Sequence, residues 1–211
     1  MELGFLVDKL KQRLQLSLPG NLAHEAFKAI PVGTRLSFKH QDSPRPGSVL
    51  ILLYEQNGIR FPLIKRPVYA GTHSGQVSFP GGKAEAGEDV YQTALREGQE
   101  EIGIDPVQVE VIGRLSEFFV IASNFVVTPI VGVLHGTPAF TPDPFEVSRI
   151  LNGNLADIIN DDAVLEKEII VGDFQLRAPY FDIEQEVVWG ATAMMLNEFR
   201  MIVKEILVTE I

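Results

Sequence analysis

The feature that most constrains this chain is a Gly-rich turn followed by a helix edged with carboxylates. The turn covers residues 82–88, and a helix that begins near Asp89 carries Glu97, Glu100 and Glu101 at i, i+3 and i+4. This spacing predicts that the three side chains converge on one helix face. Two like charges roughly 4 Å apart repel by on the order of 4 kcal/mol at an effective dielectric of about 20, and a bound cation reverses that interaction. The pattern therefore predicts a metal site.

The chemistry of the ligands narrows the choice of metal. Carboxylate oxygens are hard ligands, which favours Mg²⁺ or Mn²⁺ over Zn²⁺. The alternative is that the acidic triplet is an ordinary solvated helix face, as most charge runs are. A predicted strand that ends in Pro80, Gly81 and Gly82 favours the metal site, because glycines let the backbone approach an ion closely.

The fixed residues of this stretch resemble the Nudix box, the signature of hydrolases that cleave nucleoside diphosphates linked to another group. The matching residues are Gly82, Glu88, Arg96, Glu97, Glu100, Glu101, Gly103 and Ile104. The one departure is Gly98, where the family usually has an aliphatic residue, and it lowers helix stability by about 0.5–1 kcal/mol relative to Ala. The resemblance implies an α/β fold, a Nudix-like α/β/α sandwich on a mixed sheet.

Pyrophosphate hydrolysis needs charge neutralisation on the phosphate oxygens and an activated water in line with the bond that breaks. We therefore predict that Glu97 and Glu101 are the principal metal ligands, because i, i+4 spacing places them side by side. Glu100 is predicted as a third ligand or as a group that positions the water. The carbonyl of Gly81 is a further candidate ligand, as in the family that the box resembles.

Other box residues are predicted to act on the ligands or on the water. Arg96 is expected to orient a box carboxylate through a charge-assisted hydrogen bond, and Glu88 to brace the loop. In related enzymes the general base is either a box glutamate, here Glu100, or an acid on a distant loop. The distant candidate is Glu146, and the alternative for it is an ordinary exposed loop residue.

A second resemblance, to the coenzyme A pyrophosphatase branch of that family, rests on residues 63–66, 75–82 and 189–192. Three positions of the branch motif differ here, namely Ile64, Pro67 and Gly71. Gly71 stands where an arginine is expected, which removes a cation suited to a 3′-phosphate. Phosphate partners are then sought among Arg45, Lys65, Arg66 and Lys83, although each could be one member of a surface ion pair.

Two further side chains have both a functional and a structural interpretation. His73 lies close before the box and is either a substrate contact or a solvated loop residue. Trp189 either stacks on a nucleobase or packs in the core or a dimer interface.

Periodicity and turn residues predict the order of the elements. We expect helices at 3–16 and 21–30, strands at 49–54, 60–65, 76–79, 107–115 and 124–134, a short helix at 155–159, a hairpin of 168–171 with 178–183, and a closing helix at 188–206. The first two helices are assigned to an N-terminal extension, residues 1–34, before a Nudix domain at 35–211.

Composition limits the remaining possibilities. The 211 residues carry a net charge of −10 and no cysteine, and no long apolar run precedes or interrupts the fold. These features predict a cytoplasmic protein with no disulfide, no membrane partner and no nucleic-acid partner. The oligomeric state stays open, with a homodimer among the alternatives.

Together these features predict a Mg²⁺-dependent pyrophosphatase acting on coenzyme A or a derivative. The alternatives are an ADP-ribose-type or dinucleotide substrate, or a non-catalytic module that senses nucleotides. Such modules usually lose box carboxylates, whereas this chain keeps Glu97, Glu100 and Glu101.

Overall fold

The computed structural model describes residues 2–33, 40–68, 74–172 and 174–209. Its helices are α1 (Leu3–Arg13), α2 (Asn21–Glu25), α3 (Val90–Ile102), α4 (Leu155–Ile159) and α5 (Gly190–Val208), with single 3₁₀ turns at Pro106–Gln108 and Asp161–Ala163. Its strands are β1 (Ile30–Pro31), β2 (Arg45–Glu55), β3 (Ile59–Lys65), β4 (Val77–Ser78), β5 (Gly81–Lys83), β6 (Val109–Arg114), β7 (Phe118–Val120), β8 (Phe125–Leu134), β9 (Arg149–Asn154), β10 (Leu165–Val171), β11 (Phe174–Ile183) and β12 (Glu186–Trp189).

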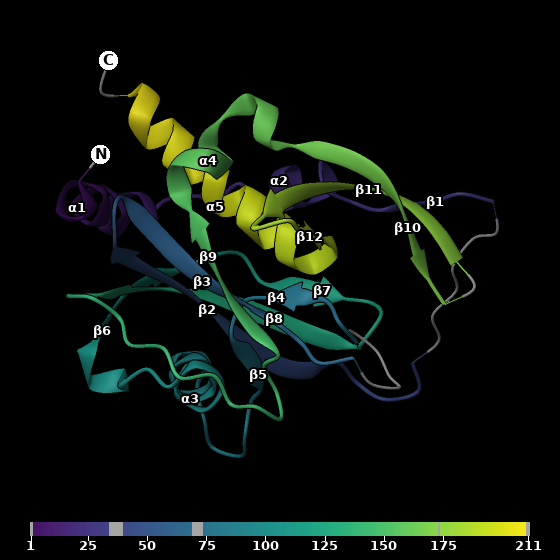
Figure 1. Ribbon diagram of the computed structural model, residues 1–211, viewed down its shortest axis with the longest axis horizontal. Coiled ribbons are helices and arrows are strands. Elements are labelled where there is room, and N and C mark those ends of the chain that lie inside the picture. Colours follow the sequence, from purple (N-terminus) through teal and green to yellow (C-terminus); the bar gives the residue numbers. More distant parts are fainter. Residues whose placement is uncertain (1, 34–39, 69–73, 173, 210–211) are drawn as a thin grey trace.

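A mixed sheet forms the centre of the described structure (Figure 1). Its main path runs β4, β3, β2, β8, β6, with β9 paired to β3, β7 to β8 and β5 to β2. The long strands β2 and β8 are parallel, from Arg45 beside Phe125 to Leu53 beside Val133, while the other pairs are antiparallel. The pairing with β5 places the Gly-rich turn at the beginning of β2.

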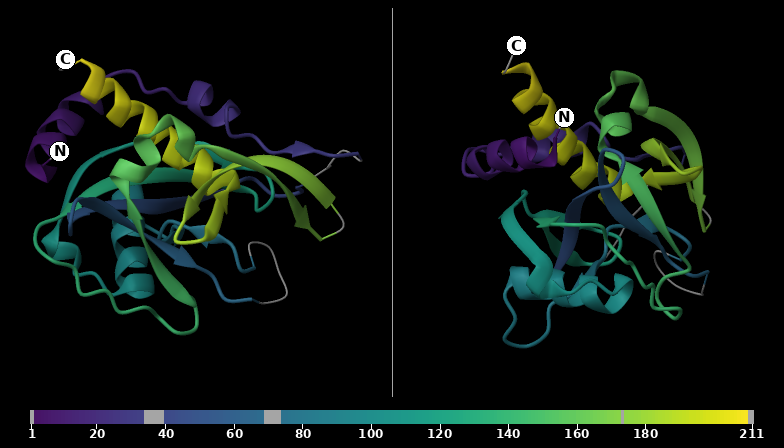
Figure 2. Two further views of the ribbon diagram at one scale, coloured as in Figure 1. Left: turned by 45° about the horizontal axis from the view of Figure 1, so that its top comes forward. Right: turned by 60° about the vertical axis from the view of Figure 1, so that its left-hand side comes forward.

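Helices cover both faces of this sheet (Figure 1, Figure 2). Residues of β2 alternate between the two faces, as a strand requires. Leu50 and Leu52 pack with Ala94 of α3, whereas Ile51 and Leu53 belong to the core formed with α1 and α5. The alternation explains why β2 is apolar almost throughout, and it gives the α/β/α layering that was predicted.

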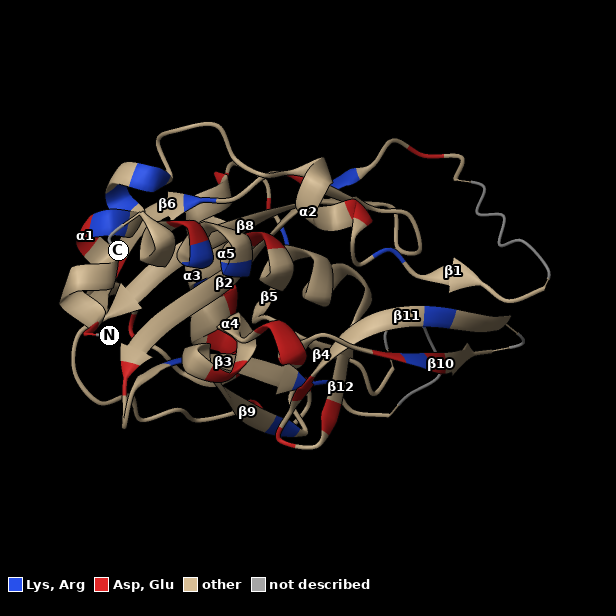
Figure 3. Ribbon diagram, turned by 90° about the horizontal axis from the view of Figure 1, so that it is seen from above, with Lys and Arg blue, Asp and Glu red and all other residues tan. Residues whose placement is uncertain are grey.

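A smaller antiparallel sheet extends to one side of the central sheet (Figure 1). It contains β10 and β11, with β1 and β12 paired to different parts of β11. The predicted late hairpin is present but longer, because pairing runs from Val171 beside Phe174 to Leu165 beside Tyr180. Viewed from above, Lys and Arg residues are dispersed among Asp and Glu residues (Figure 3). No helix in the described ranges is long and apolar enough to cross a bilayer.

Two predicted helix boundaries were wrong, and one strand was missed. The second helix ends at Glu25, and Ile30 lies in β1 instead. The closing helix begins at Gly190 rather than Val188, because Val188 and Trp189 pair with β11 as part of β12. Strand β9, which pairs along its whole length with Arg60–Lys65 of β3, was not predicted.

A buried carboxylate joins the N-terminal helices to α5. Glu198 is fully buried, and it accepts hydrogen bonds from the backbone N–H of Gly20 at 3.0 Å and from Ser116 Oγ at 2.6 Å. Its other oxygen lies 3.0 Å from His24 Nε2. Burial alone would raise the pKa of Glu198, but bonds from these three groups outweigh it and hold the pKa below its usual value. The predicted domain boundary at 34/35 lies outside the described residues and stays a prediction.

Candidate functional site

Helix α3 begins and ends at strong local signals. The side chain of Asp89 accepts hydrogen bonds from the backbone N–H groups of Tyr91 and Gln92, and the Gln92 side chain accepts one from the N–H of Asp89. This reciprocal cap fixes the first turn. At the other end Gly103 has a φ of 72°, the left-handed conformation that commonly terminates helices. The helix therefore begins where the sequence predicted.

Two glycines bring strand β5 against α3. A Cβ added to Gly82 would lie 2.5 Å from the carboxyl carbon of Glu97, so only glycine leaves room for that carboxylate. Gly81 has a φ of 156°, and a Cβ there would collide with the backbone of Ser48 and Val49. The Gly-Gly pair thus lets the backbone and a helix carboxylate share a space that a side chain would fill.

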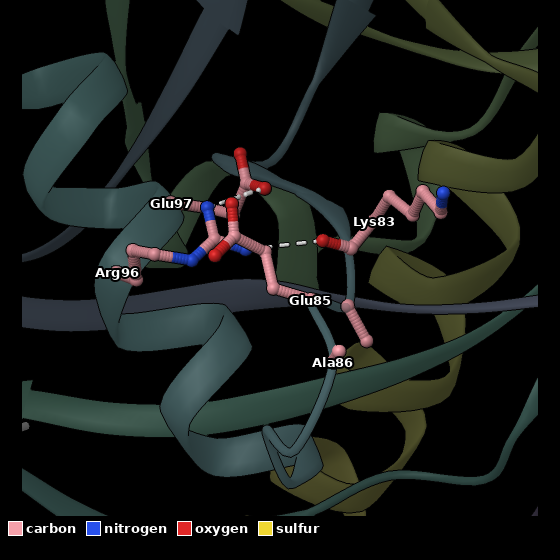
Figure 4. A pocket seen from close by; sticks show the side chains of 6 residues that line it. Lys83, Glu85, Ala86, Arg96 and Glu97 are labelled. Atoms are coloured by element: carbon pink, nitrogen blue, oxygen red, sulfur yellow. Dashed lines mark hydrogen bonds and ion pairs between the residues drawn. The ribbon is translucent and has the colours of Figure 1, made fainter.

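Arg96 holds the acidic side of this site together, and Figure 4 shows it beside Glu97 and Lys83. Its Nε donates to Glu88 at 2.7 Å, and its Nη1 donates to Glu97 at 2.9 Å and to Glu100 at 2.8 Å. Its Nη2 donates to the carbonyl of Lys83 at 3.0 Å. The bond from Arg96 is the main cause that lowers the pKa of Glu88 to about 2. One guanidinium therefore links three box carboxylates to the loop.

Glu101 lies on the inner side of the helix. Its side chain is only 1% exposed, and it accepts a hydrogen bond from the backbone N–H of Gly81 at 2.8 Å and a longer one from Arg66 at 3.4 Å. Burial raises the pKa of Glu101 to about 7, against the opposing effects of Arg66 and Gly81. Burial also raises the pKa of Glu97. The charge of Glu146 adds to both increases, so Glu146 lies within electrostatic reach of the two carboxylates.

The predicted convergence of three carboxylates is not seen. Within the described ranges, no group of three His, Cys, Asp or Glu side chains is arranged to hold a metal ion. Glu100 is 56% exposed and pairs with Arg96, whereas Glu101 is turned toward the sheet. The reason is helical geometry, since successive residues are about 100° apart around the axis. Metal binding by Glu97, Glu100, Glu101 and the Gly81 carbonyl stays a prediction.

The local chemistry nevertheless fits a hard cation. Glu97 and Glu101 are both largely buried, and burial makes ionisation of each carboxyl less favourable. The charge of Glu97 adds to this effect at Glu101. The glycine carbonyl beside them, that of Gly81, adds a third oxygen. An all-oxygen donor set of this kind suits Mg²⁺ or Mn²⁺.

An open hollow of about 460 Å³ lies beside these groups, lined by residues 83–86 with Arg96 and Glu97. The ammonium group of Lys83 points away from Arg96 and Glu97 (Figure 4). Lys83 therefore lines the hollow, but its ammonium group is directed away from the guanidinium of Arg96 and the carboxylate of Glu97.

The four predicted phosphate partners lie in different surroundings. Arg66 contacts Glu101 and the Gly81 carbonyl, both at 3.4 Å, and so lies at the site. Lys65 pairs with Glu186 at 2.7 Å. Arg45 stacks over the ring of Phe125 at 4.2 Å from its centroid. Substrate binding by these residues and by Lys83 stays a prediction.

The other candidates from the sequence are Gly71, His73 and Trp189. Gly71 and His73 lie outside the described residues. Trp189 is half-buried at the end of β12, opposite Tyr180. Sequence reasoning missed Ser48, a buried serine that faces Gly82 across the β2–β5 pairing, because nothing local marks a pairing between strands so far apart in the chain.

Comparison with known proteins agrees with this geometry. A family model described as the NUDIX domain matches residues 44–150. Nudix hydrolase 22, chloroplastic, of Arabidopsis thaliana is 39% identical over 192 residues, covering 82% of this chain and 63% of the relative. The uncharacterized Nudix hydrolase NudL of Pectobacterium atrosepticum is 30% identical, covering 92% of this chain and 93% of the relative.

A solved structure gives the same result for the fold. The MutT protein from Methanosarcina mazei Go1 superposes with a TM-score of 0.50 at 17% identity, over 82% of this chain and 99% of that one. The predicted fold class is confirmed. This chain spans less than two thirds of the length of the Arabidopsis relative.

Proposed function

The chain belongs to the NUDIX domain family, and from this membership we propose that it is a Mg²⁺-dependent hydrolase of nucleoside-diphosphate-linked substrates. The bond cleaved is the pyrophosphate. The observation that carries the proposal is the pair Glu97 and Glu101, largely buried around the Gly81–Gly82 backbone with raised pKa values. Burial raises the pKa of both carboxyls despite the bonds from Arg96, Arg66 and the Gly81 N–H, and a divalent cation bound by both would offset that cost of burying their charges.

Each box residue has a part in this proposal. Bound Mg²⁺, or Mn²⁺, supplies a Lewis acid that neutralises charge on the phosphate oxygens. Glu97 and Glu101 are the principal ligands, and Glu100 and the Gly81 carbonyl are the additional ones. Arg96, which contacts Glu97 at 2.9 Å, keeps that carboxylate oriented.

The general base is proposed to be Glu146, with Glu100 as the second candidate. Glu146 is exposed, and its charge acts on both Glu97 and Glu101. Glu100 is engaged by Arg96 at 2.8 Å, which weakens its tendency to accept a proton. A side chain at the rim of the site is better placed to take a proton from water than one that is already paired.

Coenzyme A or a derivative is the first choice of substrate, on the motif at residues 63–66, 75–82 and 189–192. Arg66 supports this choice because it is the predicted phosphate partner that lies beside Glu101. ADP-ribose-type or dinucleotide substrates are the second choice, and a non-catalytic nucleotide-sensing module the third. Cytoplasmic location and homodimer formation stay predictions from sequence.

The test is a screen of coenzyme A, dephospho-coenzyme A, ADP-ribose and a dinucleoside polyphosphate with Mg²⁺, in which the monophosphate products are identified. Glu97→Gln should lower kcat by about a hundredfold or more, because a lost ligand weakens Lewis-acid catalysis worth several kcal/mol. Glu55→Gln, an equal charge change at an exposed residue at the end of β2 that does not line the hollow, is the matched control and should keep its activity. Full turnover by Glu97→Gln, or in excess EDTA, would refute the metal assignment.

A further inference from the structure

A buried hydroxyl without a partner lies under the carboxylate site. Ser48 is 1% exposed, and its Oγ is one of three buried side-chain polar atoms in the described ranges that have no hydrogen-bond partner. The others are Ser78 Oγ and Arg13 Nε. Buried polar groups are nearly always hydrogen-bonded, so each exception calls for an explanation.

The pairing of β2 with β5 locates this hydroxyl. Ser48 stands directly opposite Gly82, and residues opposite each other in a sheet present their side chains on the same face. A Cβ on Gly82 would lie 2.5 Å from Oε1 and 2.6 Å from Oε2 of Glu97. Because Gly82 has no side chain, the space on this face of the β2–β5 pair, beside Ser48, is left to the Glu97 carboxylate.

A second contact places Ser48 on the α3 side of the sheet. Leu50, two residues along β2 on the same face, has its Cδ2 3.0 Å from where a Cβ of Gly98 would lie. Gly98 follows Glu97 on α3. Ser48 therefore lies beneath the helix segment that carries Glu97, and not in the core formed with α5.

We propose that Ser48 is a positioning residue whose hydroxyl donates a hydrogen bond to Glu97 when that carboxylate holds Mg²⁺. This inference rests on the proposed function. Arg96 Nη1 donates to Oε1 of Glu97 at 2.9 Å. A carboxylate that turns one oxygen to a cation needs its other oxygen fixed by a neighbour, and such neighbours tune metal affinity. A serine hydroxyl can rotate to donate as soon as an acceptor approaches.

The competing account is that Ser48 only fills space in the sheet, beside the buried Thr128 of β8. The two accounts differ in the effect that they predict for Mg²⁺ binding. If the Ser48 hydroxyl has no hydrogen-bond partner in the absence of Mg²⁺, it does not stabilise the protein in EDTA. Its removal should then leave the melting temperature in EDTA equal or higher. The same removal weakens Mg²⁺ binding only if the hydroxyl pairs with a ligand in the bound state.

The experiment measures two properties of the full chain, the melting temperature in EDTA and the Kd for Mg²⁺ alone by calorimetry. Ser48→Ala should melt at or above the wild-type temperature and bind Mg²⁺ about tenfold more weakly, within the range typical of residues that orient metal ligands. Ser48→Thr keeps the hydroxyl and should restore the wild-type Kd. Ser78→Ala removes the other unpaired hydroxyl, opposite Ile64 rather than Gly82, and should leave the Kd unchanged.

Several results would overturn the inference. They are a Ser48→Ala Kd equal to that of the wild type, an equal loss in Ser78→Ala, an equal loss in Ser48→Thr, and a lower melting temperature of Ser48→Ala in EDTA. A wild-type protein that binds no Mg²⁺ would refute the proposed metal site and this inference together. Normal wild-type binding with no Ser48→Ala effect would refute the inference alone.

Discussion

Replacing Glu101 by glutamine should stabilise the metal-free protein at pH 8. Glu101 is 1% exposed, and burial is the main cause that raises its pKa from 4.5 to about 7. Between these pH values the folded protein binds more protons at this site than the unfolded chain does. Stability is therefore unaffected below about 4.5, falls as the pH rises, and carries the full penalty above about 7.

The size of the effect follows from the same two pKa values. The gap between 4.5 and about 7 corresponds to an upper limit of about 3 kcal/mol. Glutamine keeps the oxygen that accepts from the Gly81 N–H, but its amide group meets the guanidinium of Arg66, which also donates. The unpaired donor offsets part of the gain. We expect a net gain of about 1–2 kcal/mol at pH 8, equivalent to about 2–8 °C in Tm for a chain of this size.

The assay is urea and thermal unfolding in EDTA at pH 5 and pH 8. At pH 5 the wild-type carboxyl is mostly protonated in the folded state, so the advantage of Glu101→Gln should largely disappear. Glu55→Gln, at an exposed carboxylate at the end of β2, controls for the change in net charge. The reasoning fails if Glu101→Gln has the same effect at both pH values, or if it destabilises the protein at pH 8.

Two further predictions concern glycines in and before the box. Gly98→Ala gains about 1 kcal/mol of helix propensity, but its Cβ would lie 2.8 Å from Ile104 Cδ1 and 3.0 Å from Leu50 Cδ2. In unfolding experiments the change should therefore be more favourable in an Ile104→Val background, which removes the nearer atom. An equal effect in both backgrounds would contradict this. Gly71→Arg should favour coenzyme A over dephospho-coenzyme A in kcat/KM by about 1.5–3 kcal/mol, through a new charge-assisted bond to the 3′-phosphate. Strong native preference for coenzyme A would show that another cation reads that phosphate.

The parts of the fold that the sequence predicted are those with local signals. Helix α3 begins at the cap formed by Asp89 and Gln92 and ends at Gly103, all readable within a few residues. Strand β9 gives no such signal, because its apolar residues Ile150 and Leu151 are followed by asparagine and glycine. Its pairing with β3 is decided by tertiary contacts alone.

Predictions of the site had a similar limit. Spacing placed Glu97, Glu100 and Glu101 on neighbouring helix positions, but it could not show that Arg96 pairs with Glu97 and Glu100 while Glu101 is buried against Arg66 and the Gly81 N–H. The boundary of the closing helix failed for a related reason. The apolar residues of β12 continue the periodicity of α5, so the strand and the helix look like one amphipathic segment in the sequence.

The buried Glu198 makes the N-terminal segment hard to separate from the rest of the chain during evolution. A shortened chain that starts at residue 35 would lose Gly20 and His24 and leave that carboxylate with one of its three hydrogen-bond partners, Ser116. An uncompensated buried charge costs about 3–5 kcal/mol, a large part of a typical domain's stability. Relatives that lack the first helices should therefore carry an uncharged residue where this chain has Glu198. The presence of the segment and the identity of that one residue should be inherited together.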